Sequence, residues 1–96
     1  MDNTIKNATG YLINEVIGNG KETGVVAFNN GACTIMMSAN NHLITILTRM
    51  TAGEFYSILQ SITDKLHIQG ATIGDIRFIN GASITNCQGI EITYVE

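Results

Sequence analysis

Residues 24–32, with the sequence GVVAFNNGA, reappear fifty positions later as residues 74–82, with the sequence GDIRFINGA. Both copies follow the pattern Gly-x-(Val/Ile)-x-Phe-x-Asn-Gly-Ala, and a glycine four positions upstream recurs as Gly20 and Gly70. Similarity at a fixed spacing indicates a repeated supersecondary unit. We therefore expect one domain over residues 1–96 that contains two related halves, residues 4–48 and 51–95.

Each copy of the repeat predicts a β-hairpin. In the first copy, apolar residues alternate up to Asn30-Gly31, a dipeptide that favours a two-residue type I′ turn, and a strand follows at residues 33–37. The second copy predicts the same turn at Asn80-Gly81 and a strand at residues 83–86. Residues 42–50 are apolar on both faces, which predicts a central strand, and residues 90–95 predict the last one.

One helix is clearly marked, over residues 52–66. Thr51 and Glu54 have the spacing of a capping box, and apolar residues follow at intervals of three and four. The N-terminal segment also carries apolar residues at helical spacing, although residues 11–17 could instead form an edge strand that turns back into Thr23. Because a helix there would mirror residues 52–66, we expect the order α-β-β-β-α-β-β-β. The predicted fold class is α+β with antiparallel sheet.

The composition indicates a chain with an unusually neutral surface. Only 14% of its 96 residues are charged, compared with about 25% in an average protein, while 45% are hydrophobic. Charge-poor surfaces are typical of buried subunit contacts. We therefore expect a homo-oligomer, with an Asn-rich, Ile-rich monomer as the alternative.

Charge and hydropathy also exclude several classes of partner. The net charge is −3 and the five basic residues are scattered, so no basic stripe could follow duplex nucleic acid. Apolar runs are far shorter than the roughly 20 residues that cross a bilayer, and the N-terminal sequence MDNTIK is unlike a signal peptide. We expect a cytoplasmic protein without a membrane partner. Cys33 and Cys87 are then expected to be reduced.

Residues 48–51 offer a possible anion site. Arg49 precedes the predicted helix start at Thr51, where free N–H groups and the positive end of the helix dipole favour an anion. The alternative is that Glu54 already satisfies these donors through the capping box and that Arg49 is simply solvated.

Catalytic and metal sites have weaker support. Cys33 and His42 could form a nucleophile and base, but no sequence pattern places them together, and an inert packed thiol is the alternative. Cys33, His42, His67 and Cys87 lack the close ligand pairs of structural zinc sites. We therefore predict no metal, no cofactor and no enzyme activity.

The two repeat copies differ in charge at two positions. Asp75 and Arg77 stand where the first copy has Val25 and Ala27. The first copy, which is apolar at these positions, would then suit a subunit contact, whereas the charged second copy would face solvent or a ligand.

We expect a small, non-enzymatic, homo-oligomeric binding module that captures a small polar or anionic, nucleotide-like ligand. The candidate ligand-binding residues are Arg49, Arg77, His42, Asn41 and Thr51. Such a chain is compatible with an accessory or phage-encoded viral inhibitor protein. The alternative is a protein-interaction module, an inhibitor or scaffold that docks through a sheet edge or through a surface at Met36-Met37.

Overall fold

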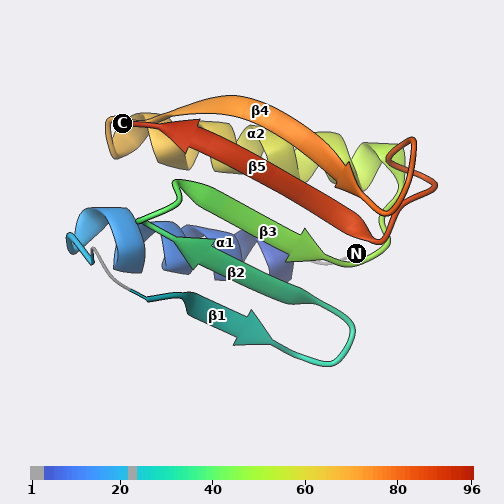
Figure 1. Ribbon diagram of the computed structural model, residues 1–96, viewed down its shortest axis with the longest axis horizontal. Coiled ribbons are helices and arrows are strands. Elements are labelled where there is room, and N and C mark those ends of the chain that lie inside the picture. The colour runs from blue at the N-terminus through green and yellow to red at the C-terminus, as the bar shows by residue number, and fades with distance from the viewer. Residues whose placement is uncertain (1–3, 22–23) are drawn as a thin grey trace.

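The computed structural model describes residues 4–21 and 24–96, which form two helical segments and a five-stranded antiparallel sheet. The chain order is α1 (Thr4–Ile13), a π-helical extension η1 (Asn14–Gly18), β1 (Val26–Asn29), β2 (Thr34–Ser38), β3 (Leu43–Leu47), α2 (Ala52–Ile68), β4 (Thr72–Ile79) and β5 (Gly89–Val95). The strands lie side by side in the order β1-β2-β3-β5-β4 (Figure 1). The predicted α+β class is confirmed.

Both helices lie on the same face of the sheet. Figure 1 shows them behind the strands, and the two helices also contact one another. The core between the layers is mainly aliphatic, with every second residue of the central strands pointing into it. Its fully buried side chains include Leu12, Ile13, Ile35, Ile44, Ile46, Ile62, Leu66, Ile90 and Ile92. Among the described residues, no helix covers the opposite face of the sheet.

Helix α2 confirms the capping signal. The Thr51 hydroxyl accepts from the Glu54 N–H at 3.2 Å, and the Glu54 carboxylate accepts from the Thr51 N–H at 2.9 Å. Phe55, Ile58 and Ile62 are buried at the predicted spacing, and the helix runs two residues past its predicted end. Local hydrogen bonding therefore determines where this helix begins.

The N-terminal segment is helical, as the repeat indicated. Ile5, Ala8, Leu12 and Val16 are buried on one face. The alternative hairpin is wrong for residues 4–18, while its expected end at Thr23 lies outside the described residues. Helix α1 thus provides the second half of the helical layer.

The first hairpin forms, but its turn is one residue later than predicted. The Asn30 N–H donates to the Cys33 carbonyl at 3.1 Å, so the loop residues are Gly31 and Ala32. Gly31 has φ 82°, a conformation that glycine adopts at low cost. The Asn30 side chain shifts the turn because its Oδ1 accepts the Cys33 N–H at 2.9 Å.

The strand expected at residues 83–86 is wrong. These residues make one isolated bridge between Ser83 and Asn86, and β4 pairs directly with β5. The observed order is therefore α-β-β-β-α-β-β. Residues 83–86 include one aliphatic side chain, Ile84, whereas β2 carries Ile35, Met36 and Met37. The second copy thus has too little apolar surface to cover the core with an extra strand.

Strand β3 is central, as predicted, but shorter than residues 42–50. It lies between β2 and β5 and ends at Leu47. The two repeat copies form β1 and β4, the two edges of the sheet (Figure 1). The repeat is therefore visible in the fold as a pair of edge strands.

Candidate binding hollow at one end of the sheet

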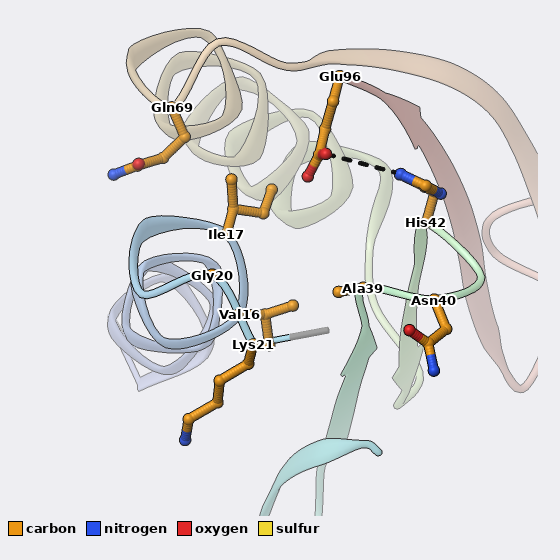
Figure 2. Close-up of a pocket in the computed structure, with 9 residues that line it drawn as sticks. All are labelled: Val16, Ile17, Gly20, Lys21, Ala39, Asn40, His42, Gln69 and Glu96. Atoms are coloured by element: carbon orange, nitrogen blue, oxygen red, sulfur yellow. Dashed lines mark ion pairs between the residues drawn. The ribbon is translucent and has the colours of Figure 1, made fainter. Parts of the chain in front are cut away.

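A hollow of about 530 Å³ opens at the end of the molecule where both helices finish. Four segments meet there: the end of η1, the β2–β3 turn, the end of α2, and the residue after β5 (Figure 2). Val16, Ile17 and Ala39 give the hollow an apolar floor, and its polar lining consists of Lys21, Asn40, His42, Gln69 and Glu96. The volume is in the range of small-molecule sites.

His42 is positioned by the β2–β3 turn. Its N–H donates to the Ala39 carbonyl at 3.2 Å, and its own carbonyl accepts from the Tyr94 N–H at 2.9 Å. Its φ is 50°, in the left-handed region where histidine is one of the few enriched side chains. This backbone places the imidazole in a T-shaped contact with the Tyr94 ring, with centroids 5.3 Å apart.

His42 and Glu96 form the polar centre of the hollow. Their Nε2 and Oε2 atoms are 3.7 Å apart, and both side chains are about half exposed. Figure 2 shows this pair facing Ile17, whereas the ends of Lys21 and Gln69 point away. Lys21 Nζ is instead 2.8 Å from Glu15 Oε2, and Gln69 donates to the Asn14 amide oxygen at 3.0 Å. A ligand that enters the hollow would therefore contact an imidazole, a carboxylate and the apolar floor.

The electrostatics of this end favour hydrogen-bond donors. The C-terminal ends of η1 and α2 both lie at the hollow, and helix C-termini carry partial negative charge. The carboxylate of Glu96 adds to this, while the ammonium of Lys21 is used by Glu15, whose hydrogen bond and charge raise the pKa of Lys21. A fully anionic group is therefore less well accommodated than an amine or hydroxyl.

Tyr94 is buried beside His42 and contacts its ring. The side chain is 2% exposed, and its hydroxyl donates to the Ser38 carbonyl at 3.2 Å. Burial raises the pKa of Tyr94 from 10.0 to about 12, and the negative charge of Glu96 contributes to the increase. The folded chain thus keeps the phenolic proton at a pH where the unfolded chain has lost it.

This difference predicts a loss of stability in alkali. The contribution of Tyr94 is fully present below pH 10, and stability falls as the pH rises from 10 towards 12, because the unfolded state binds fewer protons there. We expect the midpoint of urea unfolding to fall over this interval in the wild type and to fall less in Tyr94→Phe. Tyr56→Phe is the matched control, since Tyr56 is 66% exposed, and it should keep the wild-type slope. Equal slopes in all three proteins would contradict the assignment to Tyr94.

The five ligand residues predicted from the sequence lie in three separate places. Asn41 and His42 are neighbours in the β2–β3 turn, and both line a smaller hollow of about 390 Å³ beside Tyr94, whereas Asn41 does not line the larger one. Arg49 and Thr51 are at the other end of β3, and Arg77 lies on strand β4. Within one chain, the structure therefore does not gather the five residues into one site, and His42 alone among them lines the larger hollow.

The start of α2 is already occupied by a carboxylate from its own chain. Glu54 and Thr51 satisfy one another's N–H groups, as the alternative interpretation stated. Arg49 is exposed beside them. Any external anion would have to displace Glu54, so this helix start is a weaker candidate than the hollow.

Arg77 also has a partner on the adjacent strand. Its Nη2 is 3.0 Å from Glu91 Oε2 and its Nε is 3.3 Å from Oε1, a two-point contact across β4 and β5. This hydrogen-bonded pairing raises the pKa of the Arg77 guanidinium. The pair lies on the face of the sheet that the helices leave uncovered, away from the hollow.

The thiol and imidazole considered for catalysis are far apart. Cys33 precedes β2 and His42 follows it, so the length of that strand separates them. The Cys33 side chain is 4% exposed, and burial raises the pKa of its thiol. Cys33 therefore fits the packed, inert alternative. In the described part of the chain, no three His, Cys, Asp or Glu side chains gather into a group that could hold a metal ion.

The sequence did not indicate the contributions of Val16, Ile17, Lys21, Gln69 and Glu96 to the hollow. These residues come from three segments that are distant along the chain, and none belongs to a recognisable motif. Only folding brings them to one end of the sheet.

Comparisons with known proteins add no assignment: no protein-family model, no curated protein and no solved structure matches this chain. No helix in the described residues has the length and apolar character needed to cross a membrane. The fold and the hollow therefore define a two-layer α+β protein with a candidate small-molecule site at one end.

Proposed function

We propose that the protein is a non-enzymatic, homo-oligomeric binding module that holds a small polar ligand in the end hollow. The observation that carries the proposal is the His42–Glu96 pair, which faces an apolar floor in a hollow of about 530 Å³. Few polar groups placed over an apolar floor are typical of ligand sites. His42, with Asn41 beside it in the same turn, is the part of the sequence-based site that enters this proposal.

The chemistry of the hollow narrows the ligand class. Glu96 and the two helix C-termini attract an amine or hydroxyl, and Ile17 and Ala39 can contact a short aliphatic portion. The imidazole of His42 supplies one adaptable donor or acceptor. A small amine or amino alcohol fits these groups better than the nucleotide-like anion expected from the sequence.

The first test is native mass spectrometry of protein purified gently from its own host. A multimer that carries one constant small adduct supports the proposal and gives the mass of the ligand. A chain that carries neither an adduct nor a second subunit contradicts it. In a second experiment, backbone amide NMR spectra are recorded with putrescine and, separately, with inorganic phosphate.

Putrescine is expected to shift the amide signals of residues around Ile17, Ala39 and His42. Glu96→Gln should abolish these shifts because it removes the carboxylate charge. Arg77→Ala is the matched control, since Arg77 lies on the uncovered sheet face and its loss should leave putrescine binding unchanged. Shifts at the hollow that appear with phosphate but not with putrescine would overturn the proposed ligand class.

The uncovered sheet face favours a second function, recognition of a folded protein. Apart from the Arg77–Glu91 pair, its central side chains are uncharged and include Thr34, Met36 and Thr45. Met37 does not contribute, because it is 1% exposed and points into the core. A partner with a similarly neutral surface would fit this face. Retention of a second, non-identical protein in the native spectrum, lost in Met36→Asp, would support this function.

A further inference from the structure

The two edges of the sheet are protected to very different degrees, although they come from the two copies of one repeat. Strand β4 carries exposed Asp75 and Arg77, and its register with β5 shifts between Ile73 and Ile76. Charges and bulges are the features that keep an edge strand from pairing with another chain. Strand β1 has neither, since residues 25–29 have the uncharged sequence VVAFN and residues 26–29 pair with β2 in continuous register.

The outer side of β1 has backbone groups available for pairing. The Asn30 N–H donates a main-chain hydrogen bond to the Cys33 carbonyl, and antiparallel pairs alternate between bonded and non-bonded. The main-chain N–H and C=O groups of Val26 and Phe28 therefore point towards β2 and bond to it. Ala27 and Asn29 turn their N–H and C=O groups outward, where no strand of the described chain lies, and Val25, directly before β1, is the next residue of this alternation.

We propose that β1 pairs antiparallel with β1 of a second copy of this chain, about a two-fold axis at Ala27. Ala27 then faces its own copy, and Val25 faces Asn29 of that copy. Ala27 and Asn29 use their outward backbone groups in this register, and the strand is extended by one residue to include Val25. The strand pairing joins two five-stranded sheets into one, with both helical layers on the same side.

The side chains of residues 25–29 match this self-pairing. Val26 and Phe28 are half-buried at the edge of the core. In the proposed register Val26 of each copy faces Phe28 of the other, so the apolar core of one sheet continues into that of the second. Val25, 60% exposed in one protomer, faces the uncharged Asn29. No like charges are brought together in residues 25–29, whereas like charges directly opposite one another would destabilise the pair. The edge is therefore suited to a second copy of itself.

This inference names the contact of the homo-oligomer, and it rests on that part of the proposed function alone. The ligand in the hollow is not involved. The two ideas are separable because the mass of the assembly and the binding of putrescine are measured independently.

The test begins with light scattering across a concentration series. The wild type is expected to approach twice the 10.4 kDa mass of one chain. Ala27→Arg, which places at β1 the residue found at the equivalent position of β4, should return the mass to that of a monomer. Ala82→Arg adds the same charge in an exposed loop and should leave the dimer intact. Circular dichroism spectra of both variants check that they are folded.

The outcomes have distinct meanings. A monomeric wild type at all concentrations overturns both the β1 contact and the homo-oligomer, but leaves ligand binding to its own test. An oligomer that persists in folded Ala27→Arg overturns the β1 contact and leaves the homo-oligomer in place.

The register can be tested by cross-linking. In a bonded antiparallel pair the two Ala27 Cα atoms would be about 5.5 Å apart, within the range that a disulfide spans. Ala27→Cys should therefore oxidise to a covalent dimer much faster than the exposed control Ala82→Cys. Equal rates would overturn the proposed register.

Discussion

Replacing Gly89 with alanine is expected to lower the free energy of unfolding by about 3 kcal/mol, at the upper end of the cost of overpacking. Gly89 begins β5 and pairs with Leu47 on one side and Ile79 on the other. A Cβ there would overlap the Ile46 carbonyl oxygen and would lie 2.9 Å from the Leu47 Cα. Both obstacles are backbone atoms of the central strand β3, so relief requires β3 and β5 to separate. The decrease is measured by urea unfolding at neutral pH.

Gly10→Ala is the matched control for this prediction. Gly10 lies inside α1, and an added Cβ there would have no atom within 4 Å other than those of its chain neighbours and of the helix backbone itself. Alanine is the better helix former by about 0.8–1 kcal/mol, so this substitution should raise stability. If Gly89→Ala proved as stable as the wild type, the close approach of β3 and β5 at this position would be wrong.

Replacing Ile44 with alanine is expected to cost about 2–5 kcal/mol, the usual range for a buried Ile. Ile44 is 0% exposed in the middle of the sheet and pairs with Ile92, which is also fully buried. Closely packed strands on both sides leave little room for the site to collapse around the lost methyl groups. The measurement is the change in urea midpoint, with the slope of the transition unchanged.

The neighbouring residue provides the control for Ile44. Thr45 points to the uncovered face and is half-buried, so Thr45→Ala should cost less than about 1 kcal/mol. Equal effects at the two positions would mean that the two faces of β3 are assigned wrongly. Because β3 begins directly after His42 and β5 ends directly before Glu96, loosening this pair of strands should also weaken ligand binding in the hollow.

Elements specified by short-range chemistry were predictable from the sequence. The capping box at Thr51 and Glu54 marks a helix start because both partners are three residues apart. The first hairpin was recognisable for the same reason, although its turn moved by one residue when the Asn30 side chain captured the Cys33 N–H. The second hairpin was predicted wrongly, because the same Asn-Gly turn signal at Asn80-Gly81 is followed by residues too polar to form a further strand of the sheet.

The candidate site depended on contacts between distant residues. The sequence offered Arg49 and Arg77 as anion ligands because arginine often has that role, but Arg77 is paired with Glu91 and the helix start beside Arg49 is filled by Glu54. His42, also a candidate from the sequence, lines the hollow. Its partner Glu96 lies 54 positions away along the chain, and no local pattern connects the two.

The sequence by itself determined the α+β class, helix α2, the central position of β3 and the existence of the repeat, whereas it left the N-terminal segment open between helix and strand. Those features follow from periodicity, caps and turns, which act over a few residues. Only the tertiary structure decided that β4 and β5 pair directly, that the two repeat copies become opposite edges, and that His42 meets Glu96 beside two helix C-termini. The physical reason is that strand pairing and pockets depend on which distant apolar surfaces can be buried together, a property of the whole chain.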